Sequence, residues 1–278
     1  MTLPFEIAPL STAHARAAHG LTRAVGWTHR HEDWLFALSF GRGLGAFDAD
    51  GALRGALMWF PYGEGFGTIG MVAVDPSVHR GGMGRALMTR ALADAAGRSL
   101  QLISTEAGRR LYESLGFVVI GENAAHIGTA VDPGIAGMIE PAGADDLPAL
   151  VALDTAALGY AREALLRALA DAGEIVVLRR DGGIVGFSIC RLFGNGHVVG
   201  PVIARDNEEA RRLIAFWLRQ RAGQILRVDV PKEHAAIAVW LNDLGLARGG
   251  ESPIMVLGPP PAPIGPSQRF ALVSQAMG

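Results

Sequence analysis

The amino-acid sequence contains one pattern of elements twice, with a period of about 130 residues. In each half a short apolar segment precedes an alanine-rich helix, at residues 5–9 and again at 138–141. Two strand-like runs then flank a turn rich in Asp and Gly, at 48–51 and at 180–183. A repeat of this length indicates a duplicated domain, because solenoid units are much shorter. The chain is therefore expected to fold as two copies of one mixed α/β domain.

The boundary between the copies falls in a turn-forming stretch, Asp-Pro-Gly at residues 132–134. Before this stretch, short strands near residues 117–120 and 126–131 are expected to complete the first copy. We therefore expect an N-terminal domain over residues 1–132 and a C-terminal domain over residues 137–278.

The composition argues against several classes of partner. Of the 278 residues, 50% are hydrophobic and 19% are charged, which is enough apolar material for two buried cores. The net charge of −2 favours neither a nucleic-acid partner nor an anionic membrane. No apolar run reaches the length of a membrane span, and residues 1–6 lack the pattern of a signal peptide. With Cys190 as the only cysteine and no His-x-x-x-His pair beside an acidic residue, we expect a cytoplasmic monomer or homodimer without disulfides or metal.

The strongest indication of function is a glycine-rich turn between a strand and a helix. An apolar strand over residues 69–74 ends at Asp75, the turn follows over residues 79–84, and an amphipathic helix begins at Gly82. Unpaired N–H groups and the positive end of the helix dipole meet at such a junction and favour a pyrophosphate. Glycines at 82 and 84 let the backbone approach the ligand closely. The turn therefore predicts a phosphate-binding site.

A second segment, Leu-Tyr-Glu-Ser-Leu-Gly-Phe at residues 111–117, makes this prediction more specific. Together with the loop at 79–84 it resembles the GCN5-related N-acetyltransferase (GNAT) superfamily, in which such a loop holds the pyrophosphate of coenzyme A. Residues 26–34 are similar to the Gly-Trp-x-His-Arg-x-x-Asp-Trp segment of a bacterial subgroup with tandem GNAT folds. The resemblance covers most of residues 1–131. It implies two GNAT folds, each a mostly antiparallel twisted sheet flanked by helices, with acetyl-CoA as the cofactor.

The resemblance also implies which residues contact acetyl-CoA. Backbone N–H groups of the strand at 69–74 would hydrogen-bond the acyl carbonyl and the pantetheine arm, as an oxyanion hole does. His79 stands where the family has Gln or Arg, a change that binding through the loop backbone should tolerate. The family's asparagine after the next strand is absent, and Ser104 or Thr105 is expected to replace it. The expected cofactor-binding residues are Met71, Val72, Val74, His79, Arg80, Gly81, Gly82, Met83, Gly84, Arg85 and Thr105.

Tyr112 is the expected general acid, because a phenol with a pKa of about 10 suits protonation of an alkyl thiolate leaving group. Two carboxylates are candidates for the general base, Glu64 near the mouth of the strand pair and Glu106 before the tyrosine helix, and we prefer Glu64. Each residue also has a purely structural interpretation. Tyr112 would then be a packed helix aromatic, and the carboxylates would be solvated loop residues.

The expected acceptor-binding residues are Trp27, His29 and Arg30, in the polar turn between helices predicted over residues 12–25 and 32–40, and Trp34, in the first turn of the second helix. His29 could instead cap a helix or pack at the surface. The two indole rings could form the wall of an apolar or cationic pocket. Alternatively, they close the hydrophobic core. The sequence does not decide between these two interpretations.

The second half lacks the features that point to a cofactor. After Ala204 it reads Arg-Asp-Asn-Glu-Glu, with no glycine and with carboxylates at the start of the helix. These carboxylates can cap the helix themselves and would repel a pyrophosphate. Leu241 stands in the place of Tyr112. We therefore expect the C-terminal half to be a degenerate copy that supplies structure and part of the acceptor pocket.

These features predict an N-acyltransferase that moves an acetyl group from acetyl-CoA to the amine of a small molecule by direct attack on the thioester. Two alternatives remain: a non-catalytic acyl-CoA-binding or regulatory protein, and a protein-lysine or N-terminal acetyltransferase. The sequence does not identify the acceptor, because side chains of loops set specificity.

Overall fold

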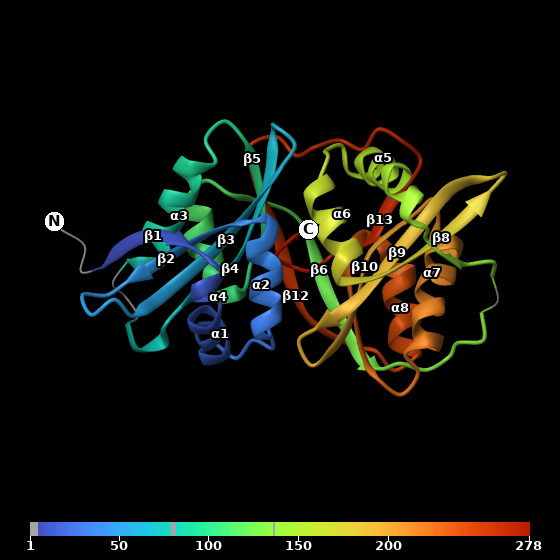
Figure 1. The fold of residues 1–278 in the computed structure, drawn as a ribbon, viewed down its shortest axis with the longest axis horizontal. Helices are drawn as coiled ribbons and strands as arrows, with labels where there is room; N and C mark the ends of the chain where they lie inside the picture. The colour runs from blue at the N-terminus through green and yellow to red at the C-terminus, as the bar shows by residue number, and fades with distance from the viewer. Residues whose placement is uncertain (1–4, 79–81, 136) are drawn as a thin grey trace.

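The structure, a computed structural model, describes residues 5–78, 82–135 and 137–278. The first half contains, in order, β1 (Glu6–Leu10), α1 (Ala15–Ala24), α2 (His31–Phe40), β2 (Arg42–Phe47), β3 (Leu53–Tyr62), β4 (Phe66–Val74), α3 (Met83–Asp94), β5 (Ser99–Ile103), α4 (Glu106–Ser114) and β6 (Val118–Thr129). The second half contains β7 (Glu140–Pro141), α5 (Leu147–Leu158), α6 (Glu163–Ala172), β8 (Gly173–Arg180), β9 (Gly183–Phe193), β10 (Gly196–Ala204), α7 (Asn207–Gln220), β11 (Ile225–Pro231), α8 (Ala235–Asp243), β12 (Ala247–Leu257) and β13 (Gln268–Ala271). The same order of elements recurs in both halves, and the mixed α/β fold with a mostly antiparallel sheet flanked by helices is confirmed (Figure 1).

One sheet runs through both halves. Within the described residues it has 13 strands in the order β1-β2-β3-β4-β5-β12-β6-β11-β10-β9-β8-β7, and β13 pairs with β10. Strand β12, from the end of the second half, lies between β5 and β6 of the first half. Strand β6 in turn pairs with β11 of the second half. The two halves therefore share a central pair of strands, β6 and β12 (Figure 1).

The shared pair corrects one expectation from the sequence. Two short strands were expected near residues 117–120 and 126–131, whereas the structure has the single strand β6. The residues between them stay extended because β6 pairs with β12 over most of its length and with β11 over its second part. Two short strands would have paired with each other as a hairpin, whereas β6 pairs with β12, a strand of the second half. A boundary at residues 132–134 therefore divides the sequence but does not divide the sheet.

One hydrophobic cluster extends across both halves. Trp34 of α2, Leu165 of α6 and Phe187 of β9 are completely buried in it. Helices α2 and α6, which belong to different halves, pack against each other there. Burial of each such side chain contributes about 1.5–3 kcal/mol to stability. This shared core fixes the position of one half relative to the other, and with it the shape of any cavity between them.

Within the part of the chain that the structure describes, no helix combines the length and apolar character needed to cross a bilayer. The same residues include no group of three or more His, Cys, Asp or Glu side chains placed to hold a metal ion. Cys190 is buried in β9, and burial raises the pKa of its thiol to about 11. The thiol is therefore protonated at neutral pH and packs as a small apolar side chain.

Candidate functional site

Strands β4 and β5 separate where the site begins. Their parallel register ends at the pair Ile69–Leu102. Two residues further on, Met71 has a φ of +54°, a left-handed conformation that costs a non-glycine residue about 1–3 kcal/mol. The register between β3 and β4 shifts at the same place. Beyond this point, the edge of β4 that faced β5 has backbone groups with no strand partner in the described sheet, and such groups can bind a carbonyl oxygen.

A groove of about 640 Å³ lies between this opening and the start of α3, and we call it the loop groove. Gly82, the residue before α3, has a φ of +72°, so the backbone conformation itself favours glycine there. Arg85 in the first turn of α3 donates a hydrogen bond of 2.7 Å to Oγ of Ser114. The loop groove is lined by Val25, Trp27, Val72, Ala73, Val74, Val78, Gly82, Met83, Gly84, Arg85, Thr105, Ala107, Gly108, Leu111 and Tyr112.

The loop groove suits an anion in its charge and in its backbone. The N-terminus of α3, a helix of 12 residues, lies in its wall and presents the positive end of the helix dipole. No Asp or Glu is among the described residues that line it. A Cβ on Gly84 would meet Leu111 at 3.5 Å and Val74 at 3.8 Å, so packing alone does not require glycine there. Three further predicted loop residues, His79, Arg80 and Gly81, lie outside the described residues.

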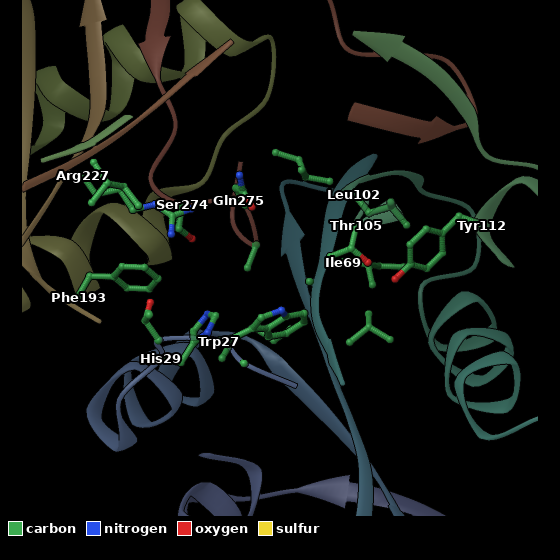
Figure 2. Close-up of a pocket in the computed structure, with 18 residues that line it drawn as sticks. Trp27, His29, Ile69, Leu102, Thr105, Tyr112, Phe193, Arg227, Ser274 and Gln275 are labelled. Atoms are coloured by element: carbon green, nitrogen blue, oxygen red, sulfur yellow. The ribbon is translucent and has the colours of Figure 1, made fainter. Parts of the chain in front are cut away.

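A second space of about 300 Å³ lies between the two halves, and we call it the interdomain cavity. Trp27, Val72, Thr105 and Tyr112 line both this cavity and the loop groove, so the two spaces meet at these residues. Figure 2 shows Tyr112 at one end of the interdomain cavity and Arg227 and Phe193 at the other. Its lining is completed by Gly26, Thr28, His29, Ile69, Gly70, Met71, Leu102, Ile103, Ile127, Ser274, Gln275 and Ala276.

Helix α4 places Tyr112 where the two spaces meet. The helix begins after Thr105, whose side chain accepts a hydrogen bond of 3.3 Å from the N–H of Gly108. Gly108 leaves room for the ring, because a Cβ there would stand 2.8 Å from Cε2 of Tyr112 and 3.2 Å from its Oη. Burial raises the pKa of Tyr112 to about 12. The phenol therefore keeps its proton throughout the neutral range, and its hydroxyl is turned toward the cavity (Figure 2).

His29 contributes an uncharged imidazole to the interdomain cavity. Its ring lies edge-on to Phe193, with 5.3 Å between the centroids. Its Nδ1 is buried and has no hydrogen-bond partner among the described residues. Burial lowers the pKa of His29 to about 4; Asp33 opposes the shift, whereas Arg227 and Arg191 add to it. At pH 7 the ring is therefore a neutral hydrogen-bonding group.

His29 should make the stability of the fold depend on pH. Because folding lowers its pKa, the unfolded chain binds the proton more readily between pH 6.5 and 4, and the folded state loses stability as the pH falls through this window. The full loss is about 3 kcal/mol, at 1.36 kcal/mol for each unit of pKa difference. We expect His29→Gln to remove this contribution in urea unfolding measured at pH 7 and pH 4. The same pH dependence in both proteins would contradict the prediction.

The structure brings most of the predicted residues to these two spaces, where their roles stay predictions. The predicted residues that line the loop groove or the interdomain cavity are Trp27, His29, Met71, Val72, Val74, Gly82, Met83, Gly84, Arg85, Thr105 and Tyr112. They come from β4, from α3 and the residue before it, from α4, from the segment between β5 and α4, and from the turn between α1 and α2. These elements meet at the opening that forms where β4 and β5 diverge after Ile69.

Glu64, the preferred base, is not brought to the site. It is exposed in the turn before β4, which begins at Phe66, whereas the opening lies beyond Ile69. The part of β4 from Phe66 to Val72 spans about 20 Å at the usual strand rise. Glu106 is also exposed, at the start of α4. Neither lines the loop groove or the interdomain cavity, so we retain neither as the base.

Arg30 and Trp34 also lie outside the two spaces. Arg30 precedes α2, and its guanidinium binds the carboxylate of Asp33 at 2.9 Å and the carbonyl of Leu192 at 3.0 Å. Trp34 is completely buried, with its Nε1 donating to Oγ1 of Thr22 at 3.3 Å. Neither residue is among the described lining of the loop groove or the interdomain cavity, so the structure gives no support to the prediction that they contact the acceptor.

The second half supplies residues to the interdomain cavity that are not predicted from the sequence. Phe193 ends β9, Arg227 lies on β11, and residues 274–276 follow β13. The apolar run Phe-Ala-Leu-Val at 270–273 was an available signal that the tail enters a core. No local pattern marks Phe193 or Arg227, because their place depends on how the two halves pack.

In the second half, the chain itself fills the corresponding opening. Strands β10 and β11 pair in parallel over two residues and then separate, as β4 and β5 do. Strand β13 enters this gap and pairs with β10 from Val202 to Ala204. On its other side, the N–H of Leu272 donates to the carbonyl of Asp229 on β11 at 2.9 Å. The space that forms the site in the first half is thus occupied by protein in the second.

The helix after β10 is capped by its own side chains, as the sequence predicts. Oδ1 of Asp206 accepts a hydrogen bond of 2.9 Å from the N–H of Glu209, and Glu209 accepts one of 3.0 Å from the N–H of Arg205. Leu241, in the position of Tyr112, is completely buried. The start of α7 therefore has fewer free N–H groups for binding an anion than the loop groove has, because the carboxylates of Asp206 and Glu209 already accept hydrogen bonds there.

Known proteins resemble the chain along its whole length. Two family models, both described as acetyltransferase (GNAT) domain, match residues 42–119 and residues 150–271. A protein of Bacillus subtilis (strain 168), described as uncharacterized N-acetyltransferase YitH, is 28% identical over 280 residues, which is 98% of this chain and 98% of that protein.

Solved structures show the same fold. A putative acetyltransferase from Pyrococcus horikoshii superposes with a TM-score of 0.84 at 15% identity, over 100% of this chain and 97% of the other. A tandem GNAT protein from the clavulanic acid biosynthesis pathway superposes with a TM-score of 0.66 at 14% identity, over 92% of this chain and 99% of the other. One family match lies in each half, and the elements repeat in the same order. The chain therefore belongs to the GNAT acetyltransferases and contains two GNAT domains in tandem.

Proposed function

We propose that this acyltransferase moves the acetyl group of acetyl-CoA to the primary amine of a small molecule, and that its first half performs the reaction. The observation that supports this proposal most directly is the meeting of the loop groove and the interdomain cavity at Trp27, Val72, Thr105 and Tyr112. A cofactor in one space and an amine in the other would have their reacting groups at the same place.

The loop groove suits the pyrophosphate of coenzyme A in its charge, because the N-terminus of α3 lies in its wall and no Asp or Glu is among its described lining residues. When bound, acetyl-CoA supplies an acetyl group as a thioester that an amine can attack directly. The N-terminus of α3 and the backbone at Gly82 and Gly84 would hold the pyrophosphate. The unpaired backbone edge of β4 at Met71 and Val72 would hydrogen-bond the acyl carbonyl and hold it in place.

Two side chains of the interdomain cavity bear on proton transfer in this proposal. Tyr112 keeps its proton in the free enzyme and can donate it, or a hydrogen bond, to the leaving sulfur. His29, with a pKa of about 4, is too weak a base to take a proton from an alkylammonium group of pKa near 10. No carboxylate is among the described residues that line the cavity. The amine would therefore bind in its neutral form, which makes up about one part in a thousand of an amine of pKa near 10 at pH 7, after giving its proton to the bulk solution. After its attack on the thioester the nitrogen releases a second, more acidic proton, which balances the one that Tyr112 gives to the sulfur.

The size of the interdomain cavity favours a small molecule over a protein segment as acceptor. Its volume of about 300 Å³ is at the lower end for small-molecule sites. The second half closes it with Phe193, Arg227 and residues 274–276. We assign the second half this role in shaping the acceptor site, and no cofactor of its own, because β13 fills the gap between β10 and β11.

Gly84→Ala tests the cofactor site without disturbing the fold. The new methyl group would make only ordinary contacts with the protein, and alanine in a helix should stabilise the fold by about 0.5–1 kcal/mol. Since the same methyl would stand against the phosphates, we expect the Kd for acetyl-CoA to rise about tenfold or more, a loss of at least about 1.4 kcal/mol. Isothermal titration calorimetry measures the Kd, and thermal unfolding measures the stability.

Gly20→Ala is the matched control, because Gly20 lies in α1 and a methyl group there would have nothing within 4 Å. It should stabilise the fold similarly and leave the Kd unchanged. An unchanged Kd in Gly84→Ala would contradict the proposed cofactor site. If acetyl-CoA binds but no amine in a broad panel is acetylated, a non-catalytic acyl-CoA-binding protein becomes the better interpretation.

A further inference from the structure

We infer that the small molecule acetylated here carries an anionic group at the end opposite its reacting amine, and that Arg227 binds this group. The inference rests on the proposed function, because it places the reacting amine at the Tyr112 end of the interdomain cavity. It adds the chemical class of the acceptor, an amine with a remote carboxylate or phosphate, and the residue that selects it.

Charge within the interdomain cavity is concentrated at one end. Arg227 is the one charged side chain among the described residues that line it, since His29 is neutral at pH 7. Figure 2 places Arg227 beside Phe193 and Ser274, away from Tyr112. Trp27 and Ile69 lie between the two ends and offer apolar surface to the middle of a ligand. The cavity therefore suits a molecule with different groups at its two ends.

The guanidinium of Arg227 is held in place and keeps a donor free. Its Nε and Nη2 donate to the carboxylate of Asp229 at 3.1 Å and 2.8 Å, and Asp229 is fully buried. The Cζ atom of the Arg227 guanidinium also lies 5.5 Å from the ring centroid of Phe193. Within the described part of the chain, no hydrogen bond occupies its Nη1. An arginine fixed in this way loses little further freedom when it binds an oxyanion.

Neighbouring charges leave this end of the cavity positive. The guanidinium of Arg191 also lies near Phe193, 5.0 Å from the ring centroid. Its nearest carboxylate is Asp33, at 3.6 Å, which also binds Arg30 at 2.9 Å. Three guanidinium groups therefore share the two carboxylates of Asp33 and Asp229, and one positive charge is left over. An anion on the ligand would be attracted, and a second ammonium group would be repelled.

Matched substrates test the inference in the wild-type protein. The values of kcat/KM would be compared for 4-aminobutyrate and 6-aminohexanoate, for their uncharged amides, and for diamines of the same lengths. A charge-assisted hydrogen bond should favour each acid over its amide by about 10–100-fold, and diamines should react slower than the amides. Aminoalkylphosphonates of equal length show which anion is preferred. A higher kcat/KM for either the carboxylate or the phosphonate than for the amide supports the inference. Equal rates for acids and amides would overturn it.

Arg227→Gln then tests the assignment to Arg227. Glutamine removes the charge and leaves only an amide N–H to pair with the buried carboxylate of Asp229, so circular dichroism first checks that the variant is folded. Where it is not, the double variant Arg227→Gln/Asp229→Asn, which removes both charges, takes its place. We expect the ratio of acid to amide to fall to about 1, because the rate with the acid falls far more than the rate with the amide. Arg219→Gln, a matched change at an exposed position of α7, should keep the wild-type ratio.

The outcomes separate this inference from the proposed function. An equal loss with acid and amide in Arg227→Gln would indicate a structural role and overturn the assignment. A preference for acids that survives in Arg227→Gln would also overturn it. Equal transfer to acids and amides in the wild type would leave the proposed function intact. Transfer to no amine at all, in a protein that binds acetyl-CoA, would remove the proposed function and the inference together.

Discussion

Replacing Tyr112 with phenylalanine should lower the rate of acetyl transfer by about a hundredfold or more, while the affinity for acetyl-CoA changes little. The change removes one oxygen and leaves the ring. That ring packs edge-on to Phe117, with 6.2 Å between the centroids, and its hydroxyl has no hydrogen bond to any described residue. The fold should therefore keep its stability. Release of free thiol measures kcat, and calorimetric titration measures the Kd.

Gly108→Ala offers a second way to disturb the same hydroxyl. A methyl group there would stand 2.8 Å from the Tyr112 ring and would have to displace it, so we expect a similar loss of rate with Tyr112 still present. An unchanged rate in Tyr112→Phe would contradict the role of proton donor. A large rise in the Kd instead would indicate that the hydroxyl binds the cofactor rather than acting in the transfer.

The sequence was most informative where function depends on neighbours along the chain. The strand, the glycine turn and the helix that together form the loop groove are consecutive, so their order alone predicts that backbone N–H groups converge at Gly82 and Gly84. Tyr112 lies on the following helix, α4, and its place at the same groove was predictable only through the resemblance to a known family. The capping of α7 by Asp206 was also predictable from the local sequence pattern.

The sequence was least informative where distant segments pair. Nothing near β6 indicates that its neighbour is β12, because both strands have ordinary strand patterns and either could have closed its own half. Glu64 was preferred as the base because it precedes β4, the strand that lines the site. However, Glu64 lies at the start of β4, whereas the site lies near the other end of that strand. Trp34 illustrates a third limit, since an aromatic residue in a pocket and one in a core have the same sequence pattern.

The duplicated fold uses its second copy to complete the first. The tail after β13 lines the interdomain cavity through residues 274–276, and hydrogen bonds hold it to both halves. The hydroxyl of Tyr62, in the first half, donates to the carbonyl of Met277 at 2.8 Å. Arg162, in the second half, donates to the carbonyl of Gly278 at 2.7 Å and is paired with the buried Asp154. One continuous segment thus fills the second opening and lines the interdomain cavity.

This dependence on the tail makes Gly200 a sensitive position. A Cβ there would stand 1.8 Å from the carbonyl oxygen of Leu272 and 2.8 Å from its carbonyl carbon. Both are backbone atoms of Leu272, which directly follows β13 in the segment that lies between β10 and β11 in the structure, so no side-chain rotation can relieve the clash. We expect Gly200→Ala to lower the free energy of unfolding by at least about 3 kcal/mol, the range of severe core substitutions. Urea unfolding followed by circular dichroism measures the loss.

Gly250→Ala is the control, because Gly250 also lies in a strand of the second half but has nothing within 4 Å of its Cβ position. Its stability should stay within about 0.5 kcal/mol of the wild type. Where Gly200→Ala still folds, kcat/KM for the amine should fall more than the affinity for acetyl-CoA, since the tail lines the interdomain cavity and not the loop groove. Wild-type stability in Gly200→Ala would show that β13 does not occupy the gap between β10 and β11. Equal losses in amine turnover and acetyl-CoA affinity would show that the tail supports the whole site instead of the acceptor side.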